Sequence, residues 1–276
     1  YWALSEVSFP KIEGNTIEDS NSKGLIRLLT RLIFVWFIKE KKLIPNILFK
    51  KNEIEEYLNS IDRTDSTYYK AILQNLFFAT LSTPQGKRKY ANKKRFYNGW
   101  NEDYGNQYVF RYQKLFKKPA DLKKYFSNIP FLNGGLFECL DNKQKNIVID
   151  GFSRIKKNQP LVPNFLFFSS ERKINLNQNY GTKNKTYKVE GLINILKRYN
   201  FTIDENTPDD QDVALDPELL GRVFENLLAN FNPETATTAR KATGSYYTPR
   251  PIVHYMVDES LKAYFKTKIK TKNIDK

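Results

Sequence analysis

The clearest pattern of apolar and polar positions lies in residues 23–41. Apolar side chains recur there every three or four residues, the spacing of one face of an α-helix. We therefore predict a helix over residues 23–41, with its charged residues on the opposite face or at its ends. The apolar face consists of Leu25, Leu28, Leu29, Leu32, Ile33, Trp36 and Phe37. The charged residues are Arg27, Arg31, Lys39 and Glu40.

The same periodicity predicts further helices, separated by loops. They span residues 53–59, 67–81, 189–199 and 216–228. The last begins with Asp216 as a cap and Pro217 at the first helical position. A backbone N–H at that position has no hydrogen-bond partner within the helix, so proline, which lacks one, is tolerated there. The first 21 residues have strand-like and loop character, and residues 175–185 form a polar run typical of an exposed loop. The expected fold class is mainly α with minor β.

A final helix is predicted over residues 249–265, directly after a short aromatic segment. Thr248 can cap this helix, and Pro249 suits its first position. Tyr246 and Tyr247 follow Gly244 just before the electropositive helix start. Free N–H groups there could bind a carboxylate while the rings cover apolar surface, which suits a small zwitterion or anion. The alternative is a glycine-led turn with two core tyrosines. The apolar face, which must pack against something, consists of Ile252, Val253, Met256, Val257, Leu261 and Tyr264.

Residues 87–118 differ from their surroundings because cations and aromatic rings alternate there. Lysine and arginine can neutralise phosphates while rings stack on bases or sugars, so this basic aromatic insertion is a candidate nucleic-acid-binding segment. The same composition is equally compatible with a solvated loop whose tyrosines are half buried. The candidate nucleic-acid-binding residues are Lys87, Arg88, Lys89, Lys93, Lys94, Arg95 and Arg111.

The amino-acid composition limits the kinds of partner that the chain is expected to bind and excludes several kinds of functional site. The 276-residue chain has 45 Lys and Arg against 30 Asp and Glu, and this net charge of +15 favours a polyanionic partner or reflects a solvated surface. A single cysteine, Cys139, excludes an internal disulfide and fits a reducing cytoplasm. With one cysteine and one histidine, His254, the chain has no Cys/His zinc cluster, and we expect no metal site. Its most apolar run, residues 32–38, is much shorter than the roughly 20 residues of a membrane span.

The segment before the final helix resembles a motif of a known enzyme family. Residues 244–249, followed by Ile252, Val253 and Met256, are similar to the segment called motif X, which precedes the catalytic domain of N6-adenine-specific DNA methyltransferases. In that family it lines the pocket for the methionine end of S-adenosylmethionine. The resemblance therefore implies S-adenosyl-L-methionine as the cofactor. The cofactor-binding residues that it implies are Gly244, Tyr246, Tyr247, Thr248 and Pro249.

Three other segments resemble large restriction–modification enzymes of the type IIG or BREX-like kind, which join nuclease, helical and methyltransferase domains in one polypeptide. They are residues 131–138 (FLNGGLFE), 206–208 (NTP) and 215–228 (LDPELLGRVFENLL), and they occur in the family's order. The resemblance implies methylation of adenine N6 at a specific sequence of double-stranded DNA, within a restriction–modification or phage-defence system.

Two loops that this chemistry needs are missing from the sequence. Methyl transfer to adenine requires a glycine-rich loop for the cofactor and an Asn/Asp-Pro-Pro-aromatic loop for the flipped base. Neither motif occurs here, and in the family both follow motif X. We therefore expect an inactive fragment from upstream of the catalytic domain, with no catalytic residues of its own. The chain also lacks a convincing Asp…Glu-x-Lys nuclease pattern, so any nuclease site of the parent enzyme is expected before Tyr1.

The expected organisation has three parts. Residues 1–200 form a helical connector region with the insertion at about 87–118, residues 201–243 form a capped helix and linker, and residues 244–276 form the start of a truncated α/β methyltransferase domain. Two other functions remain open. The chain could be an autonomous nucleic-acid-binding module that uses the insertion, or a structural spacer that fixes the distance between nuclease and methyltransferase domains.

Overall fold

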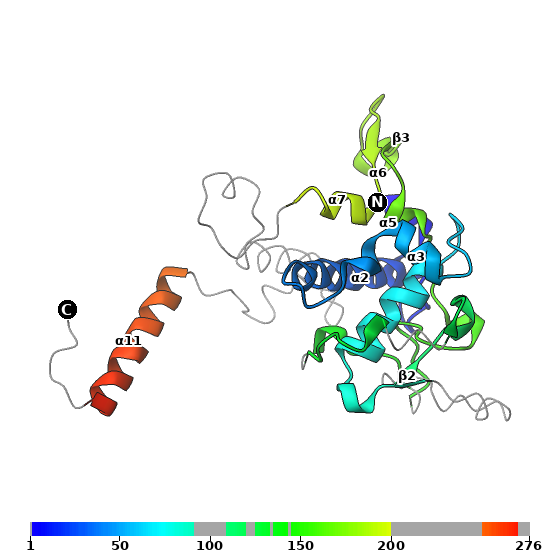
Figure 1. Cartoon of the computed structure of the whole chain (residues 1–276). Coiled ribbons are helices and arrows are strands. Elements are labelled where there is room, and N and C mark those ends of the chain that lie inside the picture. The colour runs from blue at the N-terminus through cyan, green and yellow to red at the C-terminus, as the bar shows by residue number, and fades with distance from the viewer. Residues whose placement is uncertain are drawn as a thin grey trace. The chain divides into compact units, whose positions relative to one another are not determined.

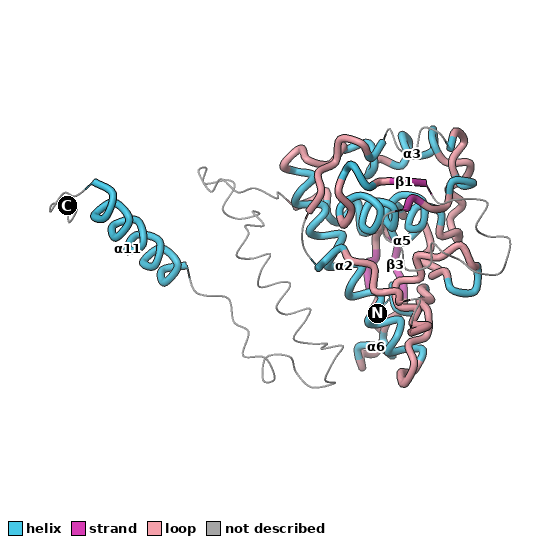
Figure 2. Tube along the Cα trace, turned by 90° about the horizontal axis from the view of Figure 1, so that it is seen from below, coloured by secondary structure: helices cyan, strands magenta, loops and turns pink. Residues whose placement is uncertain are grey.

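The computed structural model describes residues 2–90, 109–119, 125–132, 135–142, 145–199 and 250–269 (Figure 1). The chain divides into two compact units, Tyr1–Asp216 and Pro217–Lys276. The structure confirms the expectation of a mainly helical protein with a few short strands (Figure 2). No helix within the described ranges combines the length and apolar character needed to cross a bilayer.

Helix α2 (Ile17–Glu40) confirms the helix predicted over residues 23–41 and extends it toward the N-terminus. Thr16 caps its start, because Thr16 Oγ1 accepts a hydrogen bond from the Asp19 N–H at 3.0 Å. In return, the Asp19 carboxylate accepts one from the Thr16 N–H at 3.3 Å. This reciprocal capping box is encoded by the Thr-x-x-Asp spacing, which the hydrophobic pattern alone did not reveal.

The expectation of strand-like and loop character is confirmed for residues 7–16, where Ser8 pairs with Leu161 in an isolated bridge, but the residues before them are helical. They form α1 (Trp2–Glu6), which contacts α2. Phe9 then packs directly against Gly24 of α2, where a Cβ atom would lie only 2.3 Å from Phe9 Cγ. Glycine at this position therefore allows the ring to lie against the helix backbone.

A helix over residues 67–81 lies at the centre of the first unit and matches the prediction in extent. It contains two wider π-helical segments, η2 (Tyr69–Gln74) and η3 (Phe77–Leu81). All of its residues are buried except Lys70, which is partly exposed. The spacing of its apolar residues predicts one apolar side, whereas this helix is buried all round, as in the core of a large unit.

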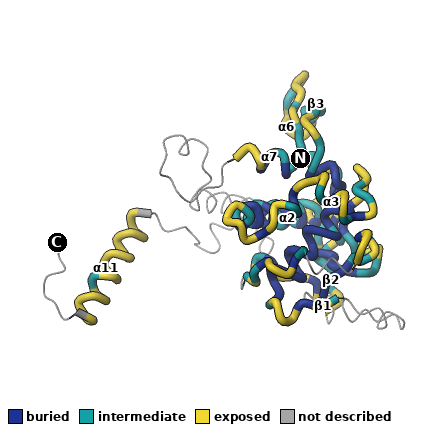
Figure 3. The backbone as a smooth tube through the Cα atoms, viewed as in Figure 1, coloured by how far each residue is buried: buried dark blue, intermediate teal, exposed yellow. Residues whose placement is uncertain are grey.

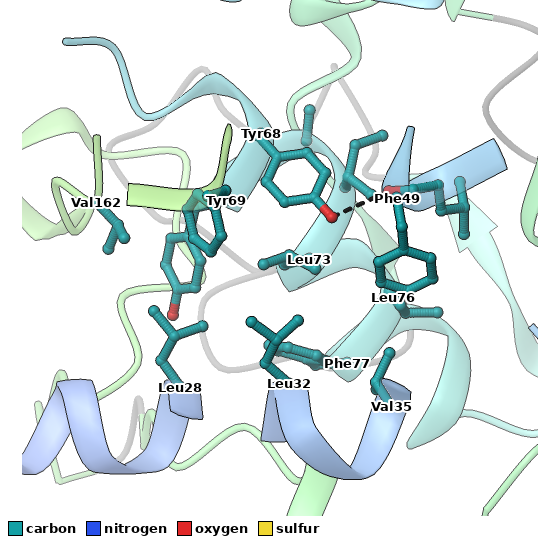
Figure 4. Close-up of a cluster of buried hydrophobic side chains, with 14 of the residues drawn as sticks. Leu28, Leu32, Val35, Phe49, Tyr68, Tyr69, Leu73, Leu76, Phe77 and Val162 are labelled. Atoms are coloured by element: carbon teal, nitrogen blue, oxygen red, sulfur yellow. Dashed lines mark hydrogen bonds between the residues drawn. The ribbon is translucent and has the colours of Figure 1, made fainter. Parts of the chain in front are cut away.

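The core forms where this central helix meets α2. Figure 4 shows Leu28, Leu32 and Val35 of α2 directed toward Leu73 and Phe77 of the central helix. All five side chains are almost completely buried. Each contributes about 1.5–3 kcal/mol through its removal from water, so this contact is a main source of stability.

Short strands complete the first unit. The strands β1 (Lys89–Tyr90) and β2 (Val109–Phe110) pair in parallel. The strands β3 (Arg172–Ile174) and β4 (Tyr187–Val189) form an antiparallel hairpin, and the polar loop predicted between them contains helix α6 (Asn177–Tyr180). The other described helices are η1 (Asn46–Phe49), α3 (Lys51–Tyr57), η4 (Gln85–Lys87), η6 (Gln113–Leu115), η8 (Gly135–Phe137), η9 (Lys156–Asn158), α5 (Phe165–Phe168) and α7 (Leu192–Leu196).

In the second unit, α11 (Arg250–Ile269) confirms the final predicted helix. Its apolar face is exposed, with Ile252 at 50% and Met256 at 59% of full exposure (Figure 3). The helix predicted over residues 216–228 and the linker before residue 244 lie outside the described residues.

Candidate nucleic-acid interface

The expected cofactor-binding residues lie just before the described part of the second unit. The described part of α11 begins at Arg250, directly after the predicted cap Thr248 and the proline Pro249. The contacts of the preceding residues are not described, so their role in cofactor binding stays a prediction. These residues are Gly244, Tyr246, Tyr247, Thr248 and Pro249.

Two short strands within the basic aromatic insertion lie side by side. Lys89 of β1 lies opposite Val109 of β2 in the parallel pair, and Tyr90 lies opposite Phe110. Residues 91–108, between the strands, lie outside the described residues. They include Lys93, Lys94 and Arg95, whose role in nucleic-acid binding therefore stays a prediction.

Arg88 is buried, which corrects its assignment to nucleic-acid binding. It is only 5% exposed, and its guanidinium donates hydrogen bonds to backbone carbonyls of the protein itself. Nη2 donates to the carbonyls of Thr80 and Ile129, each at 2.9 Å. Nε donates to Thr83 at 3.1 Å and Nη1 to Phe126 at 2.9 Å. Arg88 thus ties the end of the central helix to a distant segment, and its donors face inward, away from any phosphate.

Arg111 is also buried, and the same correction applies to it. It is 1% exposed, and its Cζ lies 4.1 Å from the centroid of the Phe152 ring. Burial lowers the pKa of its guanidinium to about 10, so the group remains charged at neutral pH. Its backbone N–H donates to Asn75 Oδ1 and its carbonyl accepts from Asn75 Nδ2, both at 2.9 Å. These bonds fasten the chain to the central helix directly after β2.

The lysines on either side of Arg88 are exposed, as a phosphate contact requires. Lys87 and Lys89 both face solvent at the start of the insertion. The alternation of exposed, buried and exposed residues distinguishes these lysines from the arginine between them, although all three carry the same charge in the sequence. In the described part of the insertion, the lysines are therefore exposed to solvent, whereas the arginines are buried within the protein.

A further group of lysines was not among the candidate residues. Lys114, Lys117 and Lys118 are exposed shortly after β2. Beside them the rings of Tyr57 and Tyr125 pack at 4.3 Å between centroids and line a pocket of about 250 Å³. The closely spaced lysines at 114, 117 and 118 were the available signal, but only the tertiary structure brings these rings next to them.

Residues 131–138, one of the segments that carry the family resemblance, are held against α2 by Arg31. Its Nε donates to the Leu136 carbonyl at 2.8 Å and its Nη2 to the Glu138 carbonyl at 2.9 Å. Its Nη1 lies 2.8 Å from the Asp150 carboxylate in a buried ion pair. Arg31 is 3% exposed, which corrects its expected position on the polar side of the helix.

The charges of this ion pair stabilise each other despite their burial. Burial opposes ionisation of both groups, but Arg31 together with Arg27 lowers the pKa of the Asp150 carboxyl below its ordinary value. The Asp150 carboxylate correspondingly raises the pKa of Arg31. Both groups therefore remain ionised, and their function is to hold the backbone of residues 136–140 in place.

Asp141 has a similar structural function in the turn before Phe152. Its Oδ1 accepts N–H donors from Ile149, Asp150 and Gly151, and its Oδ2 accepts the Phe152 N–H at 2.8 Å. Burial and the neighbouring Asp150 charge raise the pKa of Asp141. Among the described residues, no three His, Cys, Asp or Glu side chains lie close enough together to hold a metal ion.

Cys139 is not placed to act as a nucleophile. Burial and the two nearby carboxylates raise the pKa of its thiol well above the ordinary value. The reactive form of cysteine is the thiolate, which this environment disfavours.

Comparison with known proteins supports the family resemblance in general terms. The chain is 28% identical over 248 residues to a predicted type II restriction enzyme and methyltransferase of Methanocaldococcus jannaschii. The match covers 90% of this chain but only 15% of that protein. No protein-family model matches the chain, and no solved structure matches it. Over nine-tenths of its length, this chain is thus related to a protein of restriction–modification type.

Proposed function

We propose that this chain is the connector segment of a restriction–modification enzyme that transfers a methyl group from S-adenosylmethionine to adenine N6 in double-stranded DNA. The observation that carries the proposal is the match to the archaeal protein described above, which covers 90% of this chain at 28% identity. The order of the motifs supports it, because residues 131–138, 206–208, 215–228 and 244–249 follow one another as they do in the family that the sequence resembles. The chain spans a small share of that relative, so the activity proposed is that of a larger protein.

The start of α11 is a suitable place for the methionine end of the cofactor. The first N–H groups of a helix have no partner within the helix and carry a partial positive charge, so they attract a carboxylate. In our proposal Thr248 and Pro249 orient this helix start, and Tyr246 and Tyr247 cover the apolar part of the cofactor. The exposed apolar face of α11 would pack against the rest of the methyltransferase domain.

Double-stranded DNA is the proposed partner of the basic aromatic insertion. Lys87 and Lys89 are exposed at its start, and buried Arg88 and Arg111 fix its two ends on the core. A rigid base lowers the entropic cost of holding exposed cations against a phosphate backbone. In this proposal the lysines contact phosphates, and sequence recognition belongs to another region of the enzyme.

The test of the proposed reaction is methyl transfer by the complete protein that contains this chain. Incubation with labelled S-adenosylmethionine and duplex DNA, followed by mass spectrometry of the nucleosides, should detect N6-methyladenine. Methylcytosine as the product would contradict the adenine assignment, and the absence of any transfer would contradict the methyltransferase assignment.

The 276-residue chain by itself should bind the cofactor weakly or not at all. A helix start and two rings cannot replace the adenosine pocket that the missing loops would form. Calorimetric titration that found micromolar affinity, about −8 kcal/mol, would contradict this view and indicate a more complete site.

A further inference from the structure

A polar pocket of about 520 Å³ lies in the first unit, away from the residues discussed above. It is formed where residues 61–63 meet residues 164–172. Its lining holds more positive than negative charge, since three cations face one carboxylate, that of Asp62. The remaining polar lining comes mainly from hydroxyl groups. The cations and hydroxyl-bearing residues are Lys51, Arg63, Arg172, Ser169 and Ser170.

The two sides of the pocket are fastened together by Asn164, which is 2% exposed. Its backbone N–H donates to the Asp65 carbonyl and its Nδ2 to the Asp62 carbonyl, both at 2.7 Å. Its Oδ1 accepts the N–H of Tyr68 at 2.9 Å. In addition, the Phe165 N–H donates to the Arg63 carbonyl at 3.1 Å. The backbone that carries the pocket residues is therefore held in a fixed arrangement before any ligand binds.

Arg63 and Arg172 lie close to the same aromatic ring. Their Cζ atoms are 5.5 Å and 5.3 Å from the centroid of Phe165. Neither guanidinium forms an ion pair with a carboxylate among the described residues, whereas Lys51 lies 3.3 Å from Glu55. Both guanidinium groups line the same pocket and carry a positive charge, so each attracts an anion that enters it.

Two polar atoms of the pocket residues are buried without a partner in the described part of the chain. They are Ser169 Oγ and Arg172 Nε. Buried donors are almost always satisfied in folded proteins, so these two atoms are donors that a ligand could still use. The Arg172 guanidinium also packs against a second ring, since its Cζ lies 4.8 Å from the centroid of the Trp2 ring.

We propose that this pocket binds a phosphate group through Arg63, Arg172 and Ser169. Two guanidinium forks and a hydroxyl supply enough donors for the several oxygens of a phosphate, and arginine forks match that geometry closely. The phosphate belongs either to the backbone of DNA or to a small phosphorylated molecule. The inference goes beyond the proposed methyl transfer. It does not depend on that proposal, because the experiments that test it measure the binding of phosphate and of DNA and not methyl transfer.

The first experiment measures thermal unfolding of the 276-residue chain in inorganic phosphate and in chloride of equal ionic strength. Phosphate should raise the melting temperature of the wild type, since a ligand that binds only the folded state stabilises it. Arg63→Gln and Arg172→Gln should lose most of this rise, and Ser169→Ala should reduce it without disturbing the packing of the rings. Lys173→Gln is the matched control, because it removes one charge from the neighbouring exposed position of β3.

The second experiment measures binding of a labelled duplex DNA to the same variants by fluorescence anisotropy. If the phosphate comes from DNA, the two arginine variants should bind about tenfold more weakly than Lys173→Gln. If it comes from a small molecule, duplex binding should match the control while the response to inorganic phosphate is lost. The proposal is overturned if the arginine variants and Lys173→Gln respond equally to phosphate and bind duplex equally.

Discussion

Replacement of Arg88 tests whether the arginines of the basic insertion stabilise the fold or contact nucleic acid. In Arg88→Gln, the backbone carbonyls of Thr80, Thr83 and Ile129 lose their charged donor in a buried environment. A hydrogen bond to a charged group contributes about 1.5–3 kcal/mol, and glutamine can replace only part of the set. We therefore expect a loss of about 3–5 kcal/mol in the free energy of unfolding, a large share of the 5–15 kcal/mol typical of a folded protein.

Urea unfolding of the 276-residue chain, followed by circular dichroism, measures this loss. The matched control is Lys89→Gln, which removes the same charge from an exposed neighbour and should change stability by less than about 0.5 kcal/mol. Arg88→Lys gives a second, milder variant, since it keeps the charge but cannot reach all of these carbonyls at once. We expect its stability to lie between those of Arg88→Gln and the wild type.

The result that would refute this reasoning is specific. If Arg88→Gln unfolds at the same urea concentration as Lys89→Gln, the carbonyl contacts do not stabilise the protein. If it also binds duplex DNA more weakly than Lys89→Gln, then Arg88 contacts phosphate, and its assignment as a structural residue is wrong.

Three further predictions concern the insertion, the helix start and the buried ion pair. The triple change Lys93→Ala, Lys94→Ala and Arg95→Ala should weaken duplex binding and lower the slope of log affinity against log salt by up to about 2.7, whereas equal slopes in an anisotropy titration would make the segment a solvated loop. In the complete enzyme, Thr248→Val should raise the Michaelis constant for S-adenosylmethionine and leave that for DNA unchanged, at a stability cost of about 0.5–2 kcal/mol. Its control is Thr267→Val, at the other end of α11, and a variant that lowers only the melting temperature would show Thr248 to be a cap alone. Asp150→Asn should destabilise the chain at neutral pH by about 3–5 kcal/mol, because Arg31 loses its buried partner. This deficit should shrink as the pH falls below the ordinary pKa of 3.8, since the lowered folded pKa means that wild-type stability is lost there; a deficit independent of pH in urea unfolding would contradict the ion-pair argument.

The sequence by itself determined where the long helices lie. In residues 23–41, 67–81 and 249–265 the repeat of apolar positions matches the helical turn, and the structure has helices at residues 17–40, 67–81 and 250–269. Local signals of this kind depend only on neighbours along the chain, so they can be recognised without knowledge of the fold. The Thr16 capping box is also local, but the hydrophobic repeat by itself predicts a start at residue 23 and does not reveal this cap.

Only the tertiary structure decided which charged side chains are buried and which are exposed to solvent. Arg31, Arg88 and Arg111 look like surface cations in the sequence, yet all three are buried. A long side chain can bury its charge when distant carbonyls converge on it, and for Arg31 and Arg88 such partners include the carbonyls of Leu136 and Ile129, far away in the chain. The proposed phosphate pocket depends on the tertiary structure for the same reason, because Arg63 and Arg172 come to line one pocket beside Phe165 only when the fold brings their segments together.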